Sequence, residues 1–309
     1  MPTTTTITTS YNGQFAGEFV SAALLKASTL ENGLVTIKPN VKYKSILKRL
    51  SSGSLIQADS CDFDASGNIT LDERELEVKM LKVNLQECKA DFEDDYLALE
   101  MGDSAHNNIP ANFQTFLINY MQGKVAQENE IMIWQGVTGV ASYDGFETLF
   151  VADGDVIDVV GTPITSENVV AEMTKVHAAI PSNLITAPDL AINVSQSVAQ
   201  AYIIALGGFG AAGLGANGVD NKGTQWYNGG GLSFGGVAVK VANGLTAGNM
   251  VATTKSNLFF GTSLMSDKQE VKVIDMSPID MSQNVRLGMR FSAGVQYAFG
   301  GEVVYYKQA

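Results

Sequence analysis

Hydrophobic and polar residues alternate most regularly near the end of the chain. Every second position from Val285 to Phe291 is hydrophobic, and the alternation continues from Val295 to Phe299. A period of two is typical of a β-strand with one buried face. Hydrophobic patterning predicts further, shorter strands at 189–195, 237–242, 250–254, 257–261, 270–276 and 303–306.

Hydrophobic residues spaced three and four positions apart predict a long helix that Pro110 opens and that ends near residues 134–136. Proline suits the first helical position, where its missing N–H would have no partner. At 1.5 Å per residue, the helix would be about 37 Å long. Its hydrophobic positions are Phe113, Phe116, Leu117, Tyr120, Met121, Val125 and Ile131. Shorter helices are predicted at 14–30, at 166–179, and from a capping Ser195 to Gly207.

The segment 54–86 has a strand pattern that changes phase. Leu76, Val78 and Met80 alternate with charged residues, and the alternation then continues one position later from Leu81. A β-bulge produces such a shift. We expect a long two-stranded hairpin with its tip near residues 64–68. A lone hairpin is marginally stable in water, so this one should lie against another surface, for example another subunit. Antiparallel strands combined with long helices place the chain in the α+β class.

Glycine is concentrated, and charge is scarce, in one part of the chain. Twelve of the 31 glycines lie between Gly207 and Gly236. Residues 189–266 contain two acidic and three basic side chains. The cores of protein–protein interfaces are depleted of charge, so this stretch indicates assembly rather than chemistry.

The composition excludes several classes of protein. The 309 residues are enough for one or two domains, and the formal net charge of −12 argues against direct binding to nucleic acid. Nothing resembles a membrane span or a secretory signal. The two cysteines, Cys61 and Cys88, cannot form a disulfide framework and indicate reduced thiols in a cytosolic setting.

Charged residues form two clusters of opposite sign. The basic cluster contains Lys38, Lys42, Lys44, Lys48 and Arg49. The acidic cluster contains Glu87, Asp91, Glu93, Asp94, Asp95, Glu100 and Asp103. Both clusters are either solvated surfaces or patches that dock against each other, within one subunit or between subunits.

Residues 62–73 match the twelve-residue calcium loop of helix–loop–helix proteins, with Gly67 at the sixth position. The candidate ligands are Asp62, Asp64, Ser66, Asn68, Thr70 and Glu73. The flanking segments have strand patterns rather than helical ones. A polar hairpin tip requires the same residue types, so both readings stay open.

Signals for an enzyme are weak. Residues 208–213 read Gly-Phe-Gly-Ala-Ala-Gly, but a dinucleotide site needs a strand before this motif and a helix after it. Here a predicted helix comes first, so a loop that adapts to neighbouring molecules is favoured. Neither His106 nor His177 has a second histidine close in sequence. We therefore expect no catalysis, no cofactor and no resident metal.

The order of these parts resembles that of the major capsid proteins of tailed bacteriophages, which have the Hong Kong phage capsid fold that encapsulin shells also use. The nearest likeness is to capsid proteins of crAss-like phages that infect Bacteroidetes. The segments that carry the likeness are 31–44, 61–74, 202–218, 256–264, 270–276 and 284–297.

The resemblance implies a division of the chain into named parts. Residues 1–30 would be an N-terminal arm with a short helix, 31–53 a link, and 54–86 the extended hairpin loop. Residues 87–185 would form a peripheral domain with a spine helix at about 110–136. Residues 186–265 would form the axial domain, and 266–309 would return to the peripheral domain.

The resemblance also implies hexamers and pentamers that form an icosahedral head around double-stranded DNA, assembled in the bacterial cytoplasm. Portal and decoration proteins would be partners, and scaffolding would come from a separate protein or be dispensed with, because the chain starts almost at the arm. DNA would be enclosed without specific binding, and no membrane would take part. The expected assembly residues are Lys42, Lys44, Lys48, Arg49, Asp91, Glu93, Asp94, Asp95, Phe209, Leu214 and Trp226. An encapsulin-like compartment and a calcium-binding module at 62–73 are the alternatives.

Overall fold

The computed structural model describes residues 28–53, 56, 58–59, 61, 69–88, 111–139, 141–207, 231–263 and 272–308, with the backbone only at 111–117 and 207. Two compact units divide the chain. The first includes Met80–Asn129 and Ser263–Ser292, and the second includes Ala27–Lys79, Glu130–Thr262 and Ala293–Ala309. Within the described residues, no helix is long and apolar enough to cross a membrane.

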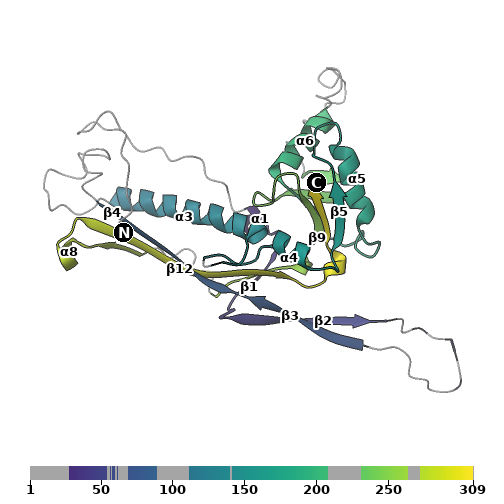
Figure 1. Cartoon of the computed structure of the whole chain (residues 1–309), viewed down its shortest axis with the longest axis horizontal. Coiled ribbons are helices and arrows are strands. Elements are labelled where there is room, and N and C mark those ends of the chain that lie inside the picture. The colour runs from purple at the N-terminus through teal and green to yellow at the C-terminus, as the bar shows by residue number, and fades with distance from the viewer. Residues whose placement is uncertain are drawn as a thin grey trace. The chain divides into compact units, whose positions relative to one another are not determined.

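A two-stranded antiparallel hairpin is formed by β2 (Lys44–Ser52) and β3 (Ile69–Glu77) (Figure 1). The pairing runs without interruption from Lys44 opposite Glu77 to Ser52 opposite Ile69. A hairpin is therefore present, but its first strand lies before the range 54–86 that the sequence pattern indicated. The predicted tip at residues 64–68 falls outside the described residues.

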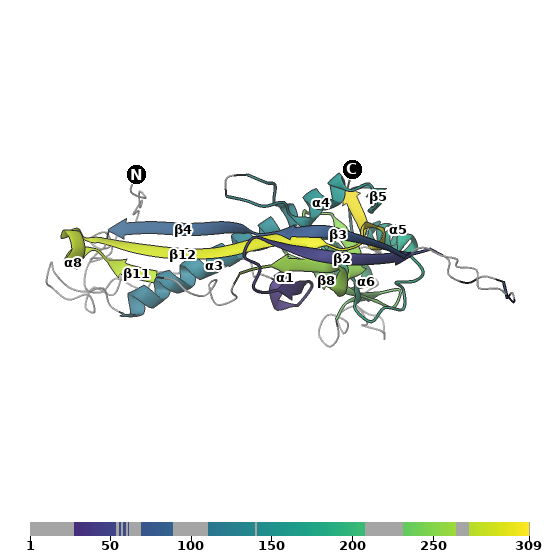
Figure 2. The same ribbon diagram turned by 90° about the horizontal axis from the view of Figure 1, so that it is seen from below.

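The predicted change of phase coincides with a change of strand partner. β3 ends at Glu77, and β4 (Lys79–Cys88) begins two residues later and pairs with β12 (Asn284–Tyr297) (Figure 2). The boundary between the two units also falls here, between Lys79 and Met80. The hydrophobic pattern shifts because β3 and β4 pair with different strands.

In the first unit, β11 (Lys272–Asp275) pairs with the beginning of β12, and the short helix α8 (Ser277–Asp280) connects them. Val285, Leu287, Met289 and Phe291 of β12 are buried, which confirms the alternation seen in the sequence. The long helix α3 (Ala111–Gln135) is confirmed as well, although Pro110 lies outside the described residues. It begins in the first unit and ends in the second.

The second unit contains a six-stranded mixed sheet in the order β5-β13-β9-β6-β8-β7. Its strands are β5 (Ile157–Gly161), β13 (Val304–Gln308), β9 (Met250–Thr254), β6 (Leu190–Val194), β8 (Val237–Val241) and β7 (Ser233–Phe234). The helices α5 (Val169–Ala179) and α6 (Gln196–Gly207) pack against it. Every residue of β6 is buried, as in a central strand covered on both faces.

This sheet joins segments that the sequence assigned to different domains. β5 comes from the expected peripheral range 87–185, and β13 comes from the range 266–309. β13 pairs with β5 on one side and with β9 on the other, so the last strand completes the same sheet as the 190–254 strands. Ser195 precedes α6 as predicted, and its Oγ accepts a hydrogen bond from the Gly248 N–H at 3.0 Å.

A second group of paired strands lies in this unit, separate from the six-stranded sheet. β1 (Thr36–Lys38) runs parallel to β10 (Leu258–Gly261), which pairs with the end of β12. The remaining elements are α1 (Ser28–Glu31), α4 (Phe146–Ala152), η2 (Lys255–Asn257) and η4 (Gly300–Glu302). Of the helix predicted at 14–30, only the last residues are described.

Candidate assembly surfaces

The two faces of the β2–β3 hairpin differ in exposure where β2 begins and β3 ends, whereas Ser51, Thr70 and Asp72 on the inner face are exposed as well. Opposed residues of an antiparallel pair share a face, and successive residues alternate between faces. The inner face carries Leu47 and Leu76, which are buried, and Arg49 and Arg74, which are half-buried. The open face consists of Lys44, Ile46, Lys48, Leu50, Ser52, Ile69, Leu71, Glu73, Glu75 and Glu77, all exposed.

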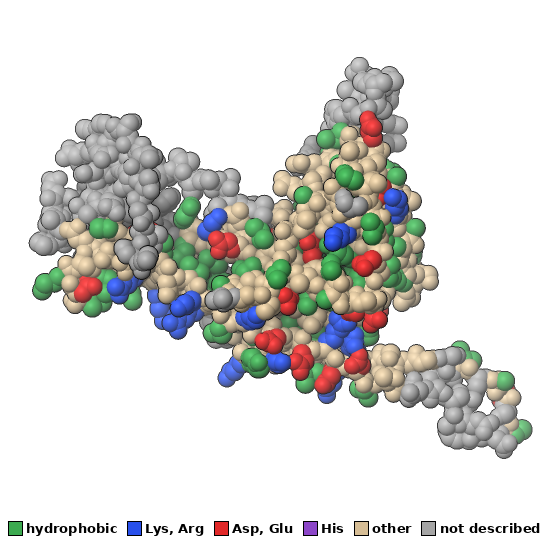
Figure 3. Space-filling model, in the orientation of Figure 1, with side chains coloured by type: hydrophobic (Ala, Val, Ile, Leu, Met, Phe, Trp, Pro, Cys, Tyr) green, Lys and Arg blue, Asp and Glu red, His purple; other side chains and the backbone are tan. Residues whose placement is uncertain are grey.

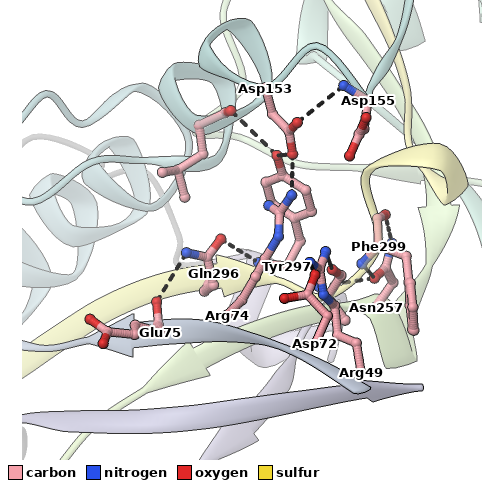
Figure 4. Close-up of polar contacts among 12 residues, drawn as sticks. Arg49, Asp72, Arg74, Glu75, Asp153, Asp155, Asn257, Gln296, Tyr297 and Phe299 are labelled. Atoms are coloured by element: carbon pink, nitrogen blue, oxygen red, sulfur yellow. Dashed lines mark hydrogen bonds and ion pairs between the residues drawn. The ribbon is translucent and has the colours of Figure 1, made fainter. Parts of the chain in front are cut away.

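Arg74 fixes the inner face to the rest of the second unit. Its guanidinium forms an ion pair with the carboxylate of Asp153 and lies 4.3 Å from the centre of the Tyr297 ring (Figure 4). The Tyr297 hydroxyl donates a hydrogen bond of 2.5 Å to the same Asp153 oxygen. These groups have low exposure, which makes the ion pair worth more than one at the surface.

Arg49 provides the second attachment. It pairs with Asp72 on the neighbouring strand and donates a hydrogen bond of 3.0 Å to the carbonyl oxygen of Ala298. Its guanidinium also lies 6.0 Å from the centre of the Phe299 ring. Asn257 holds the 298–299 backbone in place, because its Oδ1 accepts both backbone N–H groups there (Figure 4). Polar contacts from both strands therefore hold the hairpin; its root, where β2 begins and β3 ends, is fixed by them.

The Asp153 carboxyl makes the stability of this attachment depend on pH. Burial acts to raise its pKa, but hydrogen bonds from Arg74, Tyr297 and the Asp155 amide outweigh burial and lower the pKa to about 2 from 3.8. A group whose pKa is lower in the folded state stabilises folding above its unfolded pKa. That contribution is lost as the pH falls from about 4 towards 2.

We expect the wild-type protein to lose about 2 kcal/mol more unfolding free energy between pH 5 and pH 2 than the Asp153→Asn variant, which lacks this titration. Urea unfolding at each pH measures the difference. Equal losses in the two proteins would show that Asp153 does not carry the dependence.

The open face combines charge with exposed hydrophobic side chains. Lys44 pairs with Glu75 at 2.6 Å and with Glu77 at 3.5 Å, and acidic and basic side chains gather over the hairpin strands (Figure 3). Towards the end of the strands the face becomes apolar, with Leu50 61% exposed, Leu71 72% and Ile69 57%. Exposed hydrophobic residues that cluster in this way mark interaction surfaces.

A buried carboxylate anchors the point where the N-terminal segment enters the second unit. Glu130 of α3 is fully buried and accepts hydrogen bonds from Ser28 Oγ (3.0 Å), Thr29 N (3.1 Å), Thr29 Oγ1 (2.7 Å) and Gly244 N (3.3 Å). Trp134 Nε1 donates to the same Thr29 hydroxyl at 2.7 Å. One side chain therefore joins residues 28–29, the long helix α3 and the 243–249 loop.

The same loop has a second carboxylate anchor. Glu147 of α4 is buried and accepts hydrogen bonds from Thr246 N (3.0 Å), Thr246 Oγ1 (2.6 Å) and Asn249 Nδ2 (3.3 Å). Glu130 and Glu147 thus hold the loop between β8 and β9 against two helices.

The structure places only some of the predicted assembly residues. Lys42, Lys44 and Lys48 are exposed, whereas Arg49 is held on the inner face. The acidic candidates Asp91, Glu93, Asp94 and Asp95, and the uncharged candidates Phe209, Leu214 and Trp226, lie outside the described residues.

Two of the predicted calcium ligands lie on β3. Thr70 pairs with Ser51 and Glu73 with Lys48, so their side chains point to opposite faces of the hairpin. Asp62, Asp64, Ser66 and Asn68 lie outside the described residues, and the calcium hypothesis stays a prediction.

Sequence reasoning missed the residues that hold the hairpin strands and residues 28–29. Asp153 contacts Arg74, which lies 79 positions away in the sequence, and Glu130 contacts Thr29, which lies about 100 positions away. No local motif marks either pairing. The sequence around Glu130 gives no sign of its role. Glu130 lies one turn before Trp134 near the end of a predicted helix, and a carboxylate on a helix is normally expected at the surface.

No protein family model matches the chain, and no curated protein matches its sequence. Several solved structures do match. The capsid of the native GTA particle aligns with a TM-score of 0.63 and 15% identity over 95% of this chain and 94% of that chain. Gordonia phage Cozz aligns with a TM-score of 0.60 and 11% identity over 94% and 89%. The capsid of Myoviridae Phage XM1 aligns with a TM-score of 0.59 and 12% identity over 95% of both chains.

The chain therefore has the Hong Kong phage-type capsid fold, which confirms the predicted α+β class and architecture. Its structural neighbours are capsid proteins of tailed phages and related particles.

Proposed function

We propose that this protein is the major capsid protein of a tailed bacteriophage. Many copies would assemble into hexamers and pentamers and form the icosahedral head that encloses double-stranded DNA. Its role would be structural rather than enzymatic, its location would be the virion, and assembly would take place in the cytoplasm of the bacterial host. The narrower relationship to crAss-like phages of Bacteroidetes is part of the same proposal.

The observation that carries the proposal is the match over nearly the whole chain to capsid structures, with coverage of 94% or more on both sides for the GTA and XM1 capsids. The open face of the hairpin supports it, because a fully exposed strand face with clustered leucines suits contact with another molecule. The net charge of −12 supports enclosure of DNA without tight binding to it.

The parts of the chain receive roles on the same basis. Residues 54–86, together with the preceding strand β2 (Lys44–Ser52), would act as the extended loop, 87–185 as the peripheral domain and 186–265 as the axial domain around the capsomer centre. Residues 1–30 would form the arm, the part of 31–53 before β2 the link, and 266–309 the return segment. Lys42, Lys44 and Lys48 would lie at subunit contacts. Scaffolding, portal and decoration proteins would be separate partners, and an encapsulin-like compartment is the alternative use of the same fold.

Shortening the hairpin tests the proposal. Residues 50–71 can be replaced by Asn-Gly, which closes the Arg49–Asp72 pair with a favoured two-residue turn. This variant keeps both arginine attachments and the buried Leu47 and Leu76. We expect the same urea midpoint as for the full chain but no shells by sedimentation and electron microscopy. Normal shells from the shortened protein would contradict a role for the hairpin in assembly.

A further inference from the structure

The charges of the open face are sorted by strand. The basic residues, Lys44 and Lys48, both lie on β2, and the acidic residues, Glu73, Glu75 and Glu77, all lie on β3. The register places Lys44 opposite Glu77 and Lys48 opposite Glu73. At the apolar end of the same face, Leu50 lies opposite Leu71. The face therefore has a basic row and an acidic row at matching heights along the strands.

This arrangement makes the open face complementary to itself. Two copies can be placed face to face about a two-fold axis that runs along the strands. Each β2 then lies over the partner's β3, and residues that are opposed within one hairpin stay at the same height. Lys48 meets the partner's Glu73, Lys44 meets the partner's Glu77, and Leu50 meets the partner's Leu71. A two-fold interface requires such self-complementarity.

We propose that the open face of the hairpin binds the same face of a second copy of this chain about a local two-fold axis. This inference rests on the proposed shell function and specifies one of its subunit contacts. The charged rows would set the register and exclude wrong alignments. Leu50, Leu71 and Ile69, now exposed, would be buried between two aligned sheets about 10 Å apart.

An acidic partner fits this face less well. The stretch 87–103 would attract Lys44 and Lys48, but the adjacent row of Glu73, Glu75 and Glu77 would repel it. Only a partner with both signs in the same two-row order satisfies the whole face. A second copy of the hairpin has that order.

The contact is small. It involves ten side chains from each copy, whereas a stable interface uses about 20–30 residues on each side. We therefore expect it to form in concert with other shell contacts rather than as a dimer of dilute protein.

Mixing two charge variants tests the contact. In the first variant, Lys44→Glu with Lys48→Glu, both rows are acidic. In the second, Glu73→Lys with Glu77→Lys, both rows are mainly basic. Each variant alone places like charges across the interface, and we expect its shell yield to fall about tenfold or more. Co-expression of the two should restore shells that contain both chains. Each variant also has like charges within its own hairpin, and mixing the two variants does not change that repulsion. Shells that form only in the mixture therefore report a contact between hairpins of different chains.

The combined variant with all four substitutions is the matched control. Its rows are exchanged but remain complementary, so it should assemble alone and should not co-assemble with the wild-type chain. Circular dichroism of each variant verifies folding. If the mixture assembles no better than either variant, or if each variant assembles normally, the hairpin faces something else, such as the acidic stretch of a neighbour.

A cross-linking measurement separates this inference from the proposed function. In a background with Cys61→Ser and Cys88→Ser, a short bismaleimide should join a Leu50→Cys chain to a Leu71→Cys chain, in shells or in concentrated protein without shells. A Ser51→Cys chain mixed with a Thr70→Cys chain, in which both cysteines lie on the inner face, should give little product. Absence of the mixed product overturns the hairpin contact, whereas absence of shells with the product present counts against the shell function alone.

Discussion

Replacing Glu130 by alanine should lower the unfolding free energy by about 3 kcal/mol or more, because it leaves several buried donors without an acceptor. Glu130 is the common acceptor for the Ser28 and Thr29 hydroxyls and for the amides of Thr29 and Gly244. The alanine side chain also leaves a cavity beside Trp134, which is fully buried. Urea unfolding, followed by tryptophan fluorescence, measures the change.

The matched control for this substitution is Glu128→Ala. Glu128 lies two residues earlier on α3 and is exposed, so its replacement should change stability by no more than about 0.5 kcal/mol. In the Glu130 variant, protease cleavage should also increase near residues 28–31, because their anchor is lost. Equal stability of the two variants would contradict the role assigned to the Glu130 hydrogen bonds.

Replacing Gly294 by alanine should destabilise the protein by about 3 kcal/mol, through a clash that no side-chain movement relieves. A Cβ on Gly294 would overlap the carbonyl oxygen of Glu77 and would lie 3.1 Å from the Cα of Val78. The root of the hairpin therefore crosses β12 at a point where only glycine fits. We expect shell assembly to fall as well, since the substitution displaces the hairpin root.

Gly288, in the same strand, provides the control. A Cβ at this position would lie 4.0 Å from the Asn84 side chain, which is ordinary contact distance. Gly288→Ala should therefore be neutral or slightly stabilising, because alanine loses less backbone entropy on folding. A Gly294 variant as stable as the Gly288 variant would show that the crossing is looser than the structure indicates.

The elements with regular periodicity could be predicted from the sequence. The strand at 285–291 buries one face along its length, so burial appears directly as a repeating pattern. The helix at 111–135 could be located by its hydrophobic spacing, but two residues of the predicted apolar face, Tyr120 and Ile131, are exposed. The break in phase after Met80 could also be located, although its cause is a change of strand partner rather than a bulge inside one hairpin.

The elements without such a pattern could not be predicted. β2 buries Leu47 but exposes Ile46 and Leu50, so its hydrophobic residues do not mark one buried face. β13 was recognised as a strand, but its place between β5 and β9 depends on pairings about 50 and 150 residues away. Long-range pairings of this kind leave no local signal in a single sequence.

The basic assembly residues were predicted from their charge alone. For this reason the prediction placed Arg49 with the exposed lysines, although its side chain is held on the inner face. A cluster of lysines indicates a surface, but the sequence does not show which acidic residues lie beside it. The register supplies that information, because it brings Lys44 to Glu77 and Lys48 to Glu73 across the hairpin. The distinction between the open face and the inner face, which separates Lys48 from Arg49, likewise follows from pairing and not from composition.

Negative-stain electron microscopy of the expressed chain, alone and with the scaffolding protein expected from the same genome, tests the central claim most directly. The proposal predicts icosahedral shells, or tubes and sheets built from hexamers. A protein that stays monomeric under all conditions, including high concentration with the scaffolding protein present, would contradict it.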